Sequence, residues 1–116
     1  MVRGHRMSDL RHLHLHRMAL EKLRERPALR RQCLELLDRW LASPEQAPSR
    51  TWLEQWREML TDWPLERIAG TVLDPEGGQT LRQCSPLGPV LTPRERWAAL
   101  AEVNRQVQTK AGDEGG

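Results

Sequence analysis

The chain has 116 residues, which suits one domain, and it is 38% hydrophobic and 29% charged. Its formal net charge of +2 is too small to indicate nucleic-acid binding by itself, and no run approaches the roughly 20 apolar residues of a membrane span. The two cysteines are far apart and no signal peptide is recognisable, so we expect a cytoplasmic protein with reduced thiols and no membrane association.

The first part of the chain predicts two helices. Residues 1–7 carry no pattern, and we expect them to be flexible. Ser8, followed by Asp9, fits the N-cap of a helix that would end near Arg26, and Pro27 fits the first position of a second helix. The second helix has apolar residues at three- and four-residue steps, namely Leu29, Cys33, Leu36, Leu37, Trp40 and Leu41.

The middle of the chain predicts two more helices. A loop over residues 43–49, with two prolines, precedes a third helix whose apolar face carries three tryptophans. A fourth helix over about 64–73 is followed by a turn at 74–78 and by one or two helical turns that end near Gln83. The three tryptophans of the third helix are Trp52, Trp56 and Trp63.

The stretch "LRQCSPLGPVLTPRERW", residues 81–97, is apolar but contains three prolines and cannot be one helix. Pro86 and Pro89 predict an extended strap whose apolar residues pack across the other helices. The sequence Thr92-Pro93-Arg94-Glu95 then predicts a capping box that starts the last helix. Whether this segment belongs to the core or forms a docking surface is open from the sequence.

We therefore predict an all-α fold, a compact bundle of about five helices with a proline-rich extended strap before the last helix. Residues 8–108 would form a single helical domain, and residues 109–116 a disordered tail.

Few residues suggest catalysis or metal binding. His12 and His16 are four residues apart, so on a helix they share one face and could begin a metal site, but no further ligand is recognisable. Cys33 lies on an apolar face, and Cys84 has no nearby histidine to activate it. We therefore expect no catalytic residues, no bound metal and no cofactor, and a protein that is not an enzyme.

Arginines at the junction of the first two helices support an alternative function, a nucleic-acid-binding transcriptional regulator. The interspersed carboxylates, such as Glu21 and Glu25, also permit ordinary ion pairs along the helix surface. The arginines of this edge are Arg17, Arg24, Arg26, Arg30 and Arg31.

Residues 81–97, with the preceding blocks "HRMALEKLRERPALRRQCLELLDRW" and "WLEQWREML", resemble small bacterial proteins of toxin–antitoxin type operons, which share an "LRQSSPF…L…ER" ending. The resemblance covers about residues 12–105. It departs at Cys84, where serine is expected, and at residues 87–89, where Phe-Ala-Gly is expected.

This resemblance implies a non-enzymatic protein-interaction module, an antitoxin-like or regulatory subunit that binds a protein partner such as a toxin encoded nearby. The sequence does not identify the partner or the oligomeric state. The predicted partner-binding residues all come from the proline-containing segment and the start of the last helix, and are Leu81, Arg82, Leu87, Val90, Leu91, Arg94 and Trp97.

Overall fold

The computed structural model describes the backbone of residues 2–115 and the side chains of residues 8–108. Within this range the backbone forms α-helices and two short 3-10 helices, and no strand, which confirms the predicted all-α class and its five longer helices. In chain order the elements are α1 (Val2–Glu25), α2 (Leu29–Leu41), η1 (Pro44–Ser49), α3 (Arg50–Asp62), α4 (Leu65–Val72), α5 (Gln79–Gln83), η2 (Gly88–Val90) and α6 (Pro93–Gly115).

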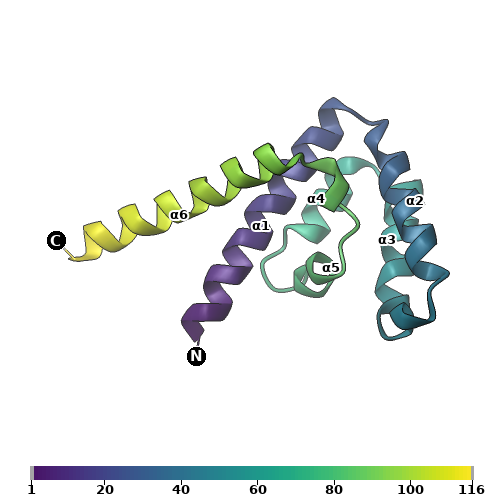
Figure 1. Ribbon diagram of the computed structural model, residues 1–116, viewed down its shortest axis with the longest axis horizontal. Helices are drawn as coiled ribbons and strands as arrows, with labels where there is room; N and C mark the ends of the chain where they lie inside the picture. The colour runs from purple at the N-terminus through teal and green to yellow at the C-terminus, as the bar shows by residue number, and fades with distance from the viewer. Residues whose placement is uncertain (1, 116) are drawn as a thin grey trace.

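Helices α2 and α3 form a hairpin at one end of the molecule, and the C-terminal end of α1 leads into it (Figure 1). The short helices α4 and α5 lie between α1 and this hairpin. Helix α6 packs across α1, and its C-terminal end points away from the rest of the chain. None of the helices in the described range is both long and apolar enough to cross a membrane.

The core is built around Trp56 of α3, which has no exposed surface. Its indole N–H donates a hydrogen bond of 2.8 Å to the backbone carbonyl of Leu81 in α5, so its one polar group is satisfied inside the core. Helices α1 to α4 contribute apolar side chains at helical spacing to the same core. The buried ones include Leu20, Leu23, Cys33, Leu37, Leu53, Met59, Leu60, Ile68 and Val72.

The ends of the first and last helices differ from the prediction. Helix α1 begins at Val2, so Ser8 lies inside it and is not its N-cap. No proline occurs among residues 2–7 to prevent the helix from extending to that point. Helix α6 likewise continues to Gly115. The structure does not describe the side chains of residues 2–7 and 109–115, nor any part of Met1 and Gly116. The flexible start at residues 1–7 and the disordered tail at residues 109–116 therefore stay predictions.

The proline-containing segment between α5 and α6 belongs to the core. Gly88–Val90 form η2, in which the Val90 N–H donates to the Leu87 carbonyl at 3.1 Å, so this part is a tight turn where we predicted extended chain. Proline's fixed φ suits a 3-10 turn as well as an extended strap, so the prolines alone did not distinguish the two. The apolar side chains buried here are Pro86, Leu87, Val90 and Leu91.

Arg82 of α5 is also buried, with only 5% of its surface exposed. Its Nη1 donates to the backbone carbonyls of Val72 at 2.6 Å and Asp74 at 2.8 Å, and its Nη2 donates to the carbonyl of Pro75 at 3.0 Å. The last carbonyls of a helix have no partner within it, and they are the negative end of the helix dipole. The guanidinium therefore caps the C-terminal end of α4 and holds α5 against it.

Gly78 allows this close approach of α5 to α4. A Cβ at Gly78 would lie 2.7 Å from the Thr71 carbonyl oxygen, 2.8 Å from Arg82 Nη1 and closer still to the Val72 carbonyl oxygen. Its φ of −91° is open to any residue, so the requirement for glycine is one of space.

Gly78→Ala is therefore expected to destabilise the protein by about 1–3 kcal/mol, because the added methyl group forces the backbone of α4 and α5 apart. Gly70→Ala is the matched control, because Gly70 lies in α4 with nothing within 4 Å of its Cβ position. It should stabilise the protein by about 0.5–1 kcal/mol through helix propensity. Urea unfolding followed by tryptophan fluorescence measures both, and equal effects of the two substitutions would contradict the packing described here.

Candidate functional site

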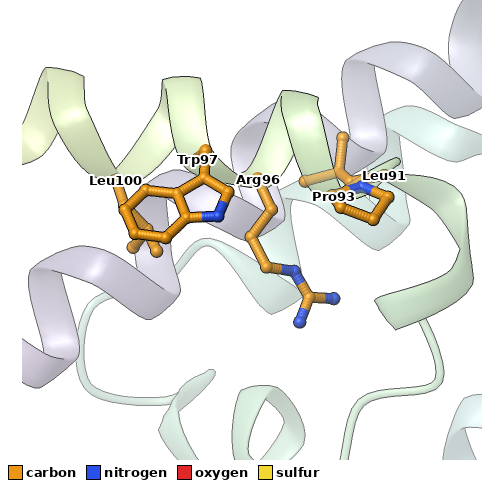
Figure 2. A pocket seen from close by; sticks show the side chains of 5 residues that line it. All are labelled: Leu91, Pro93, Arg96, Trp97 and Leu100. Carbon is orange, nitrogen blue, oxygen red and sulfur yellow. The ribbon is translucent and has the colours of Figure 1, made fainter.

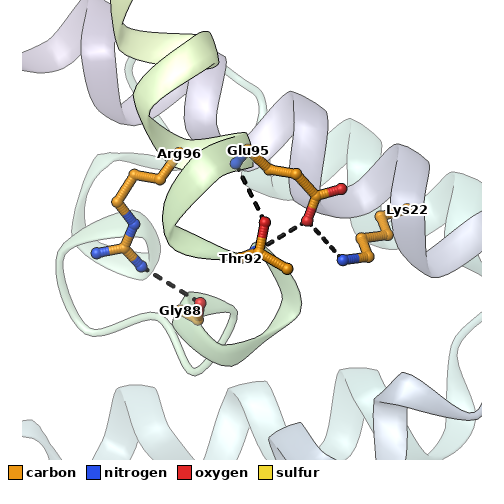
Figure 3. A network of polar contacts seen from close by, with 5 residues as sticks. All are labelled: Lys22, Gly88, Thr92, Glu95 and Arg96. Carbon is orange, nitrogen blue, oxygen red and sulfur yellow. Dashed lines mark hydrogen bonds and ion pairs between the residues drawn. The ribbon is translucent and has the colours of Figure 1, made fainter.

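The start of α6 is held rigidly by the predicted capping box (Figure 3). The Thr92 backbone N–H donates to Glu95 Oε1 at 2.8 Å, and the Glu95 backbone N–H donates to Thr92 Oγ1 at 3.1 Å. Pro93 occupies the first helical position, where its missing N–H has no cost. The capping box thus confirms the prediction made from residues 92–95.

Glu95 also fixes α6 to α1. Lys22 Nζ of α1 donates to Glu95 Oε1 at 2.6 Å. The hydrogen bond from Lys22, followed by that from the Thr92 backbone, lowers the pKa of the Glu95 carboxyl to about 2. The Glu95 carboxylate therefore pairs with Lys22 of α1 and accepts from the Thr92 N–H at the start of α6. It forms no ion pair with Arg94 or Arg96, its neighbours in the sequence.

The next turn of α6 presents Trp97 to solvent, with 75% of its surface exposed. Among the large apolar side chains that the structure describes, the next most exposed is Met18 at 41%. Trp97 borders a surface hollow of about 430 Å³, whose other lining residues are Leu91, Pro93, Arg96 and Leu100. Figure 2 shows the indole ring beside Leu100, with the Arg96 side chain extending between Trp97 and Pro93.

This exposure follows from how α6 packs. The buried residues of α6 are Ala99 and Val103, four residues apart, and they turn toward α1. Trp97 is two residues before Ala99, which is about 200° around a helix, so it lies on the opposite side. The sequence alone did not reveal that only the Ala99 side of this helix is covered.

The predicted partner-binding set divides into two groups. Five of them are buried at 8% exposure or less and form the core, with only their edges at surface hollows: Leu81, Arg82, Leu87, Val90 and Leu91. Arg94 and Trp97 are exposed on α6. Sequence reasoning missed Pro93, Arg96 and Leu100 as residues of the same surface, because their places around Trp97 depend on the helix start at Thr92.

The arginines proposed for nucleic-acid binding do not all remain available. Arg30 Nη1 donates to the backbone carbonyls of Leu60 and Trp63, each at 3.1 Å, and so caps the end of α3. Arg24 lies 3.8 Å from the Glu21 carboxylate. The remaining three, Arg17, Arg26 and Arg31, are exposed.

The histidines and cysteines do not form a catalytic or metal-binding arrangement in the described part of the chain. His12 is exposed and His16 is buried, and no group of three metal-ligating side chains occurs among the described residues. Burial raises the pKa of the Cys33 thiol to about 11 and also raises that of Cys84. Both shifts disfavour the thiolate that a nucleophile requires.

Comparison with protein-family models, with curated proteins and with solved structures found no match for this chain.

The Lys22–Glu95 contact predicts an acid-sensitive contribution to stability. A carboxyl whose folded pKa is lowered stabilises the fold above its unfolded value of about 4.5, and this contribution is lost as pH falls through about 2. Glu95→Gln keeps the capping box, because glutamine also caps, but it removes the charge. Urea midpoints of wild type and Glu95→Gln are therefore expected to differ at neutral pH and to converge between these two pH values.

Glu58→Gln is the control, because Glu58 is an exposed carboxylate on α3. Its urea midpoint should follow that of wild type throughout the titration. Parallel pH profiles for wild type and Glu95→Gln would show that the Lys22 contact contributes no charge-dependent stability.

Proposed function

We propose that this protein is a non-enzymatic protein-interaction module, an antitoxin-like or regulatory subunit that binds a partner protein through the start of α6. The observation that supports this is the 75% exposed Trp97 beside the hollow of about 430 Å³. Tryptophan at a surface is enriched in the centres of protein interfaces, where burial of its large apolar ring contributes to affinity.

The charges around Trp97 suggest the chemistry of the partner. Arg94 and Arg96 lie on either side of Glu95 in the first turns of α6, and Glu95 is engaged by Lys22. The docking surface therefore combines an apolar hollow with cationic side chains. Its complement is a protein segment that carries an apolar side chain flanked by aspartate or glutamate.

The start of α6 is also rigid, which suits it to binding a partner protein. The capping box and the Lys22 contact hold the helix in place before any partner arrives. A docking surface that is already ordered loses little conformational entropy on association, and this favours affinity.

The test is co-expression of the full chain with the product of the adjacent gene, with the complex measured by light scattering and calorimetry. Trp97→Ala is expected to weaken the complex about 30-fold, which corresponds to about 2 kcal/mol for a central tryptophan. Trp52→Ala is the matched control, because Trp52 is a surface tryptophan of α3 that is 38% exposed, and it should bind like wild type.

The absence of any complex, or equal binding by the Trp97 and Trp52 variants, would contradict the proposal. Binding of duplex DNA that falls steeply with salt, is lost in Arg31→Gln and survives in Trp97→Ala would instead support the nucleic-acid-binding alternative.

A further inference from the structure

A second, smaller hollow of about 160 Å³ lies between α1 and the segment that runs from α5 through η2 into α6. Apolar side chains such as Leu15 and Leu87 form part of its wall. Its polar lining comes from His16, Arg82, Ser85 and Arg96. Since a water molecule takes up about 30 Å³ of liquid, the hollow has room for a small polyatomic ion.

His16 provides a buried polar atom that faces no partner. Its side chain is 8% exposed, and Nδ1 lies 2.6 Å from the backbone carbonyl of His12. A carbonyl only accepts hydrogen bonds, so Nδ1 carries the proton and Nε2 of the neutral ring is an acceptor. Among the described residues no donor reaches Nε2, which is buried. A buried acceptor without a donor is costly, so a ligand that donates a hydrogen bond to Nε2 would remove this cost.

The charge around this hollow is positive. None of the ion pairs among the described side chains includes Arg82 or Arg96, and no aspartate or glutamate lines the hollow. The hydrogen bonds of Arg82 go to three neutral carbonyls, and Arg96 Nη2 donates to the Gly88 carbonyl at 3.3 Å (Figure 3). A concave site lined by cations alone attracts anions.

Ser85 adds a further donor. Its Oγ accepts a hydrogen bond of 3.1 Å from the Leu87 backbone N–H, which orients the side chain at the hollow. The hydroxyl hydrogen remains to be donated to another acceptor. The site therefore offers guanidinium and hydroxyl donors for oxygen atoms, together with one acceptor at His16.

We propose that this hollow binds a hydrogen phosphate group, whose oxygens accept from Arg96 and Ser85 and whose own hydroxyl donates to His16 Nε2. Arg82, which also lines the hollow, supplies a second positive charge. The group that fits is one that is anionic and still carries a proton. Sulfate has the same shape and charge, but at neutral pH it has no proton to donate, so it would leave the histidine acceptor unpaired.

The state of His16 determines this preference. The groups around it are His12 on α1, Arg82 on α5 and Arg96 on α6, with no carboxylate among the residues that line the hollow. Burial, and to a smaller extent the charge of Arg82, lowers the pKa of His16 to about 4, so the ring is neutral at physiological pH. In acid the protonated ring would donate, and the preference for phosphate over sulfate should disappear.

The experiment is calorimetric titration of the full chain with inorganic phosphate and with sulfate at neutral pH and fixed ionic strength. Phosphate is expected to bind about tenfold more tightly than sulfate, which is the value of one charge-assisted hydrogen bond. NMR of the histidine side chains should show that phosphate changes the chemical shift of His16 Nε2. A parallel titration with glycerol phosphate, a monoester that at neutral pH is mostly the dianion without a proton, should give an affinity close to that of sulfate.

Arg96→Gln and Arg94→Gln are a matched pair, because both remove one charge from the first turns of α6. Only Arg96→Gln should weaken phosphate binding, by about tenfold. His16→Leu should equalise phosphate and sulfate. Should that variant fail to fold, the arginine pair still decides. Trp97→Ala should leave phosphate binding unchanged, so this proposal and the docking proposal are tested separately.

Three results would overturn the proposal. They are no binding of inorganic phosphate at millimolar concentration, equal affinity for phosphate and sulfate in wild type at neutral pH, and equal weakening by the Arg96 and Arg94 substitutions.

Discussion

The buried guanidinium of Arg82 is the contact on which the second half of the fold depends. It joins α5 to the end of α4 through three backbone carbonyls, and the preceding residue, Leu81, accepts the hydrogen bond of the Trp56 indole. Two adjacent residues of α5 therefore connect that short helix to both α3 and α4. A five-residue helix has little stability of its own, so these contacts, and the side chains it buries, position it.

The position of α5 decides which surfaces are left for function. From Arg82 the chain turns inward, and Leu87 and Val90 are buried before Thr92 starts α6. The apolar side chains of the proline-containing segment therefore belong to the core. The exposed apolar surface lies instead in the first turns of α6, at Trp97, and the small cationic hollow forms where the proline-containing segment passes α1. One packing arrangement thus produces both candidate sites, which share Arg96.

The sequence predicted the parts of this fold that depend on local patterns. The apolar spacing of α2 and the capping box at residues 92–95 are local signals, and both are present in the structure. Arg82 was predicted to bind a partner, but it is buried, and nothing near it in sequence shows that the carbonyls of Val72, Asp74 and Pro75 will accept from it. The exposure of Trp97 could not be predicted for a similar reason. Its spacing suits a buried helix face, and only the packing of α6 on α1 shows which face is covered.

Urea unfolding of Arg82→Met measures how far Arg82 holds the segment after α5 in the core. Methionine retains much of the apolar stem but leaves the carbonyls of Val72, Asp74 and Pro75 without their donor. With Arg94→Met as the exposed control, the predicted result is a loss of about 3 kcal/mol or more for Arg82→Met alone. A loss below about 0.5 kcal/mol, typical of a surface substitution, would show that the guanidinium does not hold this segment in place.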